Sequence, residues 1–164
     1  MTDVQLGRCV IIPIDGSSLC HRAFNWFLKF AYRPNDFIYF AHVMHPKVAA
    51  HKMVVSLERP TEFISQNFSG DYDEASQLMN KYNKLAEAAN IASSSEILAG
   101  SSVADAILKM AAERQANLIV VPTRGNESVK RTLIGDVSKH LVNHSNFPVL
   151  VVPPIPRTMS LTLA

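Results

Sequence analysis

Short apolar runs alternate with amphipathic segments along most of the chain. Most of these runs are almost continuously apolar, which is typical of a strand buried on both faces of a parallel sheet. The predicted strands lie at residues 8–14, 37–43, 95–99, 117–121 and 148–152. Pro13 weakens the first prediction locally, because proline cannot donate to a strand ladder.

The segments between these runs carry apolar residues at helical spacing, which predicts four helices. The first follows a cap at Ser17 or Ser18, with Ala23, Phe27, Phe30 and Ala31 inward, and ends by Pro34. The other three helices are predicted at 71–91, in the segment from Ser102, and at 135–144. The inward residues of the helix at 71–91 are Ala75, Leu78, Tyr82, Leu85 and Ala89. Residues 45–70 show no clear period, and we expect an irregular crossover there.

Strands that alternate with helices predict an α/β fold. We expect a three-layer sandwich, in which helices cover both faces of a five-stranded, mostly parallel open sheet. No linker divides the chain, so residues 1–164 are predicted to form a single domain. Its core spans about 8–153, and 154–164 form a flexible tail.

Composition narrows the functional classes. The chain has 164 residues, a net charge of +2 and scattered Lys and Arg, so nucleic acid is not an expected partner. It lacks the long apolar run of a membrane span and the layout of a signal peptide. Cys9 and Cys20 are too few for a disulfide framework, and buried free thiols fit a cytoplasmic protein.

Open α/β sheets bind ligands beyond the carboxyl ends of their strands. Three segments follow predicted strands at that edge: residues 15–18, residues 42–45 and the loop that begins at Pro122. Asp15 can accept hydrogen bonds from a ribose or an adenine amine, although an aspartate before glycine is also common in turns. Arg124, Gly125 and the backbone around Gly135 can hold phosphate at a helix N-terminus. His42 closes the second strand and either contacts ligand or packs.

The combination of these segments resembles the universal stress protein family over residues 8–153. The resemblance is carried by Asp15-Gly16-Ser17, His42-Val43, Gly100, the segment 117–125, Gly135–Ser138 and the segment 148–153. It implies an adenine-nucleotide alpha-hydrolase-like fold and an adenine-nucleotide pocket. The implied nucleotide-binding residues are Asp15, Gly16, Ser17, Val43, Pro122, Arg124, Gly125, Gly135, Asp136, Val137 and Ser138.

Two positions depart from the family's phosphate-binding pattern, which is glycine, two residues, glycine, nine residues, then glycine followed by serine or threonine. Pro122 replaces the first glycine and removes a backbone donor. Asp136 replaces the hydroxyl residue and puts a negative charge beside the phosphates. We expect Asp136 to cap the last helix and to hinder triphosphate binding. The alternative is an ATP site in which Mg²⁺ bridges Asp136 to phosphate.

Other constellations carry less weight. His140 and His144 have a spacing that can bind zinc, but no adjacent carboxylate supports a catalytic site, and we predict no metal site. Ser17, Ser18 and Ser138 lack a nucleophile elbow. The chain has neither a Walker loop nor a Gly-x-Gly-x-x-Gly motif. Catalysis is therefore the weaker hypothesis.

We accordingly predict a non-catalytic stress-response protein whose pocket favours adenosine or AMP over ATP, with no required cofactor and with Mg²⁺ only if ATP binds. The alternatives are a dimeric protein-interaction scaffold without nucleotide, and a slow ATPase or phosphotransferase. An exposed apolar edge strand is an aggregation hazard unless something pairs with it. The resemblance implies a homodimer through Val149, Leu150, Val151 and Val152. The alternative is that the C-terminal tail covers that edge.

Overall fold

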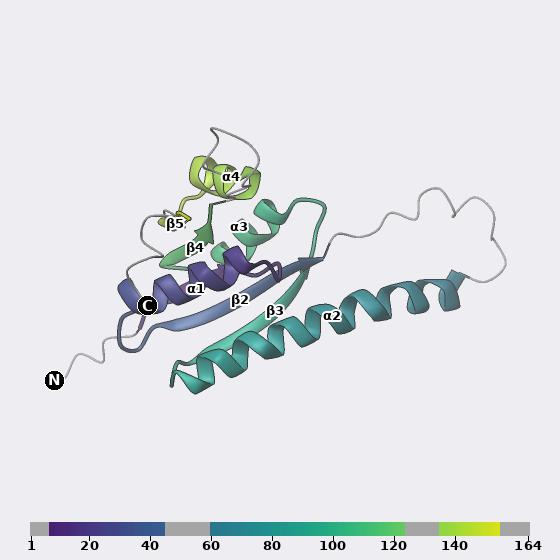
Figure 1. Cartoon of the computed structure of the whole chain (residues 1–164). Coiled ribbons are helices and arrows are strands. Elements are labelled where there is room, and N and C mark those ends of the chain that lie inside the picture. The colour runs from purple at the N-terminus through teal and green to yellow at the C-terminus, as the bar shows by residue number, and fades with distance from the viewer. Residues whose placement is uncertain (1–6, 45–59, 124–134, 155–164) are drawn as a thin grey trace.

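The computed structural model describes residues 7–44, 60–123 and 135–154, with only the backbone for residues 60–70. Its elements run in the order β1 (Cys9–Pro13), α1 (Ser18–Phe30), β2 (Phe37–Met44), α2 (Pro60–Ala88), β3 (Ser93–Ala99), α3 (Val103–Glu113), β4 (Leu118–Pro122), α4 (Asp136–His144) and β5 (Val149–Val152). The strands form one five-stranded sheet in the order β3-β2-β1-β4-β5, and every pairing is parallel. The predicted α/β fold is confirmed (Figure 1).

Two hydrophobic cores lie on opposite faces of this sheet. α1 and α2 cover one face, where Phe24, Phe40 and Tyr82 form a cluster with ring centroids 5.2 to 5.8 Å apart. α3 and α4 cover the other face, where Ile107 and Leu141 are fully buried (Figure 1). Because successive strand side chains point to opposite faces and both faces are covered, the three middle residues of β1 and of β4 are all buried. This explains why the strands read as continuous apolar runs.

The prediction of an irregular crossover up to residue 70 is wrong for its last part. α2 begins at Pro60 rather than at residue 71, while residues 45–59 lie outside the described part of the chain. Proline is well tolerated in the first turn of a helix, where its missing donor would have no intrahelical partner. Gly70, which we had interpreted as a boundary, lies inside the helix at a cost of about 1 kcal/mol relative to alanine.

The helix faces are mostly as predicted, with two exceptions. Ser17 is the N-cap of α1, and its hydroxyl accepts from the backbone N–H of Cys20. Phe30, however, is 63% exposed and contacts Trp26 and Lys29 instead of the core. Ala89 is exposed as well, because α2 has already ended.

A partly buried ion pair ties Arg8, just before β1, to Asp36, just before β2. Arg8 donates from Nε to Oδ1 of Asp36 (2.9 Å), from Nη2 to Oδ2 (2.6 Å), and also to the carbonyl of Ala31 (2.8 Å). Asp36 is only 1% exposed and also accepts from the backbone N–H of Arg33. Burial acts to raise the pKa of Asp36, but the bonds from Arg8 and Arg33 outweigh it, so the pKa lies below its usual value.

The substitution Asp36→Ala is expected to lower the free energy of unfolding by about 3 kcal/mol at pH 7, because it leaves the Arg8 guanidinium without its partner. Glu96→Ala is the control, since the Glu96–Arg114 pair is largely exposed and contributes at most about 1 kcal/mol. Urea unfolding measures both. A lowered pKa stabilises the fold above the unfolded value of about 4, so the Asp36 effect should shrink as the pH falls below it. Equal costs for the two variants at pH 7 would contradict this account.

Candidate functional site

A cavity of about 680 Å³ opens at the carboxyl ends of the strands. It lies at the topological switch point, where β1 has β2 on one side and β4 on the other. Its walls come from all the elements that meet there. They are Pro13, Ile14, Asp15, Gly16, Cys20, Ala41, His42, Val43, Met44, Asp71, Glu74, Ala75, Leu78, Val103, Val121, Pro122, Gly135, Val137 and Ser138.

Two prolines end the ladder between β1 and β4 at this cavity. The β1–β4 pairing is recorded only at Val10 and Ile11, whereas β1 pairs with β2 as far as Pro13. Ile14 donates its N–H to β2, so the preceding residue, Pro13, faces β4. The next two bonds of the ladder would need N–H donors from Pro13 and Pro122, and neither residue has one.

Pro122 faces the same gap from the other side. Thr123 donates its N–H to the carbonyl of Val152 on β5 (2.9 Å), so Pro122, one residue earlier, faces β1. Proline in a central strand would normally remove a ladder bond, but here both prolines lie where the ladder stops. The recorded β1–β4 pairing therefore stops short of the cavity, which both prolines line.

The turn from β1 into α1 shapes one wall of the cavity. Gly16 has a φ of +82°, a conformation that L-residues with a side chain rarely adopt, so this turn requires glycine. Oδ1 of Asp15 accepts from the backbone N–H of Ser17 and from the thiol of Cys20, both at 2.9 Å. Both of these bonds go to Oδ1, so the contacts at that oxygen orient the carboxylate.

The ionisation of Asp15 follows from these contacts. Partial burial acts to raise its pKa, but the hydrogen bonds from Cys20 and Ser17 outweigh it, so the pKa lies below its ordinary value. Asp15 is therefore a carboxylate at neutral pH. A carboxylate only accepts hydrogen bonds, so it selects ligand groups that donate, such as hydroxyls and amines.

The end of β2 supplies a second wall. Nδ1 of His42 lies 2.7 Å from the carbonyl oxygen of Ile14, and since a carbonyl only accepts, Nδ1 is the donor. This contact fixes the ring beside the cavity. Gly100, directly after β3, donates its N–H to the carbonyl of Met44, and a Cβ at Gly100 would lie 3.3 Å from Ala106. Glycine there allows α3 to approach the β2 end closely.

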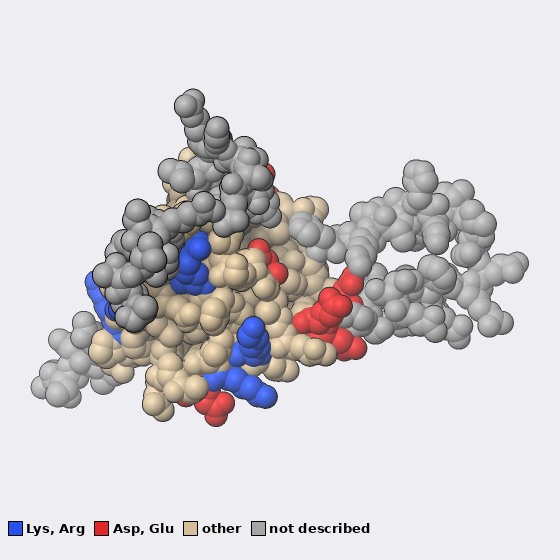
Figure 2. Space-filling view, in the orientation of Figure 1, with Lys and Arg blue, Asp and Glu red and all other residues tan. Residues whose placement is uncertain are grey.

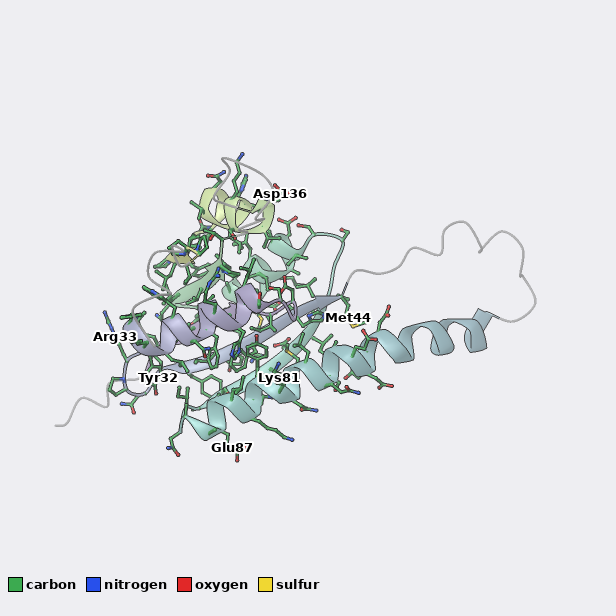
Figure 3. All side chains as sticks on the ribbon, viewed as in Figure 1. Tyr32, Arg33, Met44, Lys81, Glu87 and Asp136 are labelled. Atoms are coloured by element: carbon green, nitrogen blue, oxygen red, sulfur yellow. The ribbon has the colours of Figure 1, made fainter. Side chains whose placement is uncertain are left out.

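The start of α4 differs from the prediction. The N-cap is Gly135, not Asp136, which lies in the first turn of the helix. Asp136 is exposed and is not among the residues that line the cavity (Figure 3). The prediction of Asp136 as the cap is wrong because glycine precedes it in the extended conformation that a cap requires. The buried hydroxyl of Ser138 instead donates to the carbonyl of Pro122 (2.7 Å) and fixes α4 to the end of β4.

Most of the residues predicted for the site come together. Seven of them line the one cavity: Asp15, Gly16, Val43, Pro122, Gly135, Val137 and Ser138. Ser17 acts as a helix cap behind it. Arg124 and Gly125 lie outside the described residues. Sequence reasoning missed Cys20 and Glu74, because neither belongs to a recognisable motif.

The described walls of the cavity are acidic. Asp15, Asp71 and Glu74 line it, and within the described ranges no Lys or Arg does. Figure 2 shows one group of acidic side chains at the side of the molecule, and another acidic group beside basic side chains at the bottom of the view. Asp15, Asp71 and Glu74 place carboxylates on the described walls.

His140 and His144 stack with ring centroids 4.2 Å apart, and Nε2 of His140 lies 3.0 Å from Oδ1 of Asp105. In the described part of the chain no three His, Cys, Asp or Glu side chains gather in a way that could hold a metal ion.

Among the described helices, none has the length and apolar character needed to cross a membrane.

Comparison with known proteins identifies relatives of the whole domain. The model of the universal stress protein family matches residues 8–153. Universal stress protein MJ0531 of Methanocaldococcus jannaschii is 27% identical over 148 residues, covering 90% of this chain and 83% of that protein.

Two solved structures share the fold. Hypothetical protein MJ0577 superposes with a TM-score of 0.74 at 22% identity, over 92% of this chain and 99% of its own. The universal stress family protein At3g01520 of Arabidopsis thaliana, solved with AMP bound, gives a TM-score of 0.61 at 18% identity, over 88% of this chain and 90% of its own.

Proposed function

Because the chain belongs to the universal stress protein family, we propose that its cavity binds adenosine or AMP in preference to ATP, without catalysing a reaction. The observation that carries the proposal is the cavity at the switch point, with the oriented carboxylate of Asp15 in its wall. The AMP bound to the similar fold of At3g01520 supports an adenine ligand. The volume of about 680 Å³ lies within the usual range for small-molecule sites, about 300 to 1,000 Å³.

The nucleoside end of the site is supported by both polar and apolar groups. Asp15 accepts hydrogen bonds from the ribose hydroxyls or the adenine amine. The backbone at the end of β2, around Val43, supplies further polar groups, while Leu78 and Val103 provide apolar walls for the base. This division between apolar walls and a few fixed polar groups is typical of small-ligand sites.

The phosphate end is the altered part. Pro122 lines the cavity and has no N–H to offer a phosphate oxygen. The exposed carboxylate of Asp136 lies in the first turn of α4, between the lining residues Gly135 and Val137, and its negative charge disfavours an approaching phosphate. Asp15, Asp71 and Glu74 add negative charge to the walls. Each added phosphoryl group therefore meets more repulsion, which favours adenosine and AMP.

The role we propose is that of a cytoplasmic nucleotide-responsive protein rather than an enzyme. A catalyst needs a base, nucleophile or metal beside the reacting atoms. In the described walls the titratable groups are carboxylates, His42 and a protonated thiol, and none of them stands beside a phosphate-binding donor set. No cofactor is required, and Mg²⁺ would enter only together with ATP.

Isothermal titration calorimetry should give adenosine and AMP affinities at least tenfold tighter than that of ATP, which corresponds to about 1.4 kcal/mol. Each ligand is titrated with and without Mg²⁺. The variant Asp15→Ala should lose adenosine binding by about tenfold or more, because the acceptor for the ligand's donors is gone. ATP that binds as tightly as AMP would refute the preference, and binding unaffected by Asp15→Ala would refute the site.

Restoring the family's residues with Pro122→Gly and Asp136→Ser together should raise ATP affinity by about tenfold, since it adds a backbone donor and removes a charge. Adenosine affinity should stay within a factor of about two. Glu87→Ser is the control for net charge, because Glu87 is exposed near the far end of α2 (Figure 3). If Glu87→Ser raises ATP affinity equally, the effect is one of overall charge and not of this site.

We further propose a homodimer through β5, by way of Val149, Leu150, Val151 and Val152. Among the described strands β5 pairs with β4 alone. The carbonyls of Pro148 and Val152 accept from β4, so the alternate residues Val149 and Val151 face outward. An apolar edge with outward backbone groups is suited to pairing with its symmetry mate.

The substitution Val151→Pro should convert the dimer into a folded monomer, because it removes an outward N–H and leaves the β4 ladder intact. Leu150→Pro, which faces β4, should instead unfold the protein. Size-exclusion chromatography with light scattering measures the mass, and circular dichroism the fold. A wild-type protein that is monomeric at micromolar concentration, with its edge covered by the C-terminal tail, would exclude the dimer.

A further inference from the structure

We propose that Cys20 is a positioning residue of this cavity, whose thiol holds the Asp15 carboxylate in the orientation that receives the nucleoside. The inference rests on the proposed function, but the geometry behind it is independent of the ligand. No part of the sequence pattern that marks the pocket includes Cys20.

The contact that carries the inference is short and lies in the cavity wall. Sγ of Cys20 is 2.9 Å from Oδ1 of Asp15, and the side chain of Cys20 is 4% exposed. The N–H of Ser17 reaches the same oxygen at 2.9 Å. Two donors converging on Oδ1 fix the rotation of the carboxylate about its Cβ–Cγ bond. Oδ2 is thereby left for the ligand's donors.

The thiol acts as a donor and not as a nucleophile. Burial, with a further contribution from the neighbouring Asp15 carboxylate, raises the pKa of Cys20 to about 12. At neutral pH the thiol therefore keeps its proton, and it is the thiolate that attacks electrophiles. The same hydrogen bond stabilises the ionised carboxylate, and so it helps to keep the pKa of Asp15 low.

Other ionisable groups face this pair from the neighbouring elements. Tyr82 approaches from α2, and burial together with Cys20 and Asp15 raises its pKa to about 12, so it stays neutral. His42 from β2, with Asp71 and Glu74 from α2, lines the same cavity. Because these groups are the same in every variant at position 20, a difference between such variants reports on the Cys20–Asp15 bond.

The chain contains its own control cysteine. Cys9 opens β1 at the opposite end of the strand, and its backbone N–H is held by the side chain of Asn117 at 2.8 Å. It does not line the cavity. Cys9→Ala and Cys20→Ala each remove one thiol, but only Cys20→Ala removes a contact to Asp15.

The test is calorimetric titration with adenosine between about pH 4 and pH 8. Cys20→Ala should bind adenosine about tenfold more weakly. The acid limb of its binding profile should move to higher pH, because Asp15 loses a bond that lowers its pKa. Cys20→Ser, which keeps a donor, should restore most of the affinity, and Cys9→Ala should match the wild type. An unchanged affinity and pH profile in Cys20→Ala would overturn the proposal.

A second measurement separates this inference from the proposed function. If the wild type binds no adenosine, the proposed function fails, but NMR titration of the Asp15 carboxyl carbon still tests the bond. The pKa of Asp15 should be higher in Cys20→Ala than in the wild type, and equal values would overturn the inference. Should Cys20→Ala not fold, Asp15→Asn replaces it. The pKa of Cys20, followed by alkylation rate against pH, should then fall, and no change would overturn the inference.

Discussion

The interruption of hydrogen bonding between β1 and β4 is the constraint on which the account of the site depends. Two neighbouring central strands would normally continue their ladder to the end. Here the next donors on both strands are prolines, Pro13 and Pro122, and the recorded β1–β4 pairing stops at Ile11. The β1–β2 and β4–β5 ladders continue past this level, as far as Pro13 and Pro122. The cavity is thus built into the strand sequences as well as into the loops.

The chemistry of the cavity follows from what surrounds this gap. Asp15 is held as a carboxylate by donors behind it, and the described walls carry two further carboxylates and no cation. Pro122 contributes a carbonyl that Ser138 already occupies and no N–H. Acceptors therefore dominate the described surface. Acceptor groups of this kind bind ligand groups that donate, such as hydroxyls and amines.

Much of the fold could be predicted because the relevant signals are local. Apolar runs identified four of the strands and a shorter segment the third strand, β3, and Ser17 and Ser102 marked helix starts that the structure confirms. The errors arose where a local signal competes with context. Gly70 resembles a boundary but lies within α2, and Phe30 fits the helical period although the core beneath it already ends.

The site was predictable only in part, for a physical reason. Strand-end residues such as Asp15 and Pro122 are found from their position along the chain. The role of Cys20 is not, because it depends on where the first turn of α1 points its side chain. Asp136 shows the opposite failure, since its residue type suggests a cap although Gly135 occupies the capping position. The direction of a side chain in the first turn of a helix depends on dihedral angles that cannot be inferred from the residue pattern alone.

A crystal structure of the protein grown with AMP tests the central claim most directly. The account predicts a nucleoside between the ends of β1 and β4, with a ligand donor within hydrogen-bond distance of Oδ2 of Asp15. At Pro13 and Pro122, no backbone hydrogen bond should join β1 to β4. A structure in which AMP binds elsewhere, or in which the β1–β4 ladder closes across this gap, would contradict it.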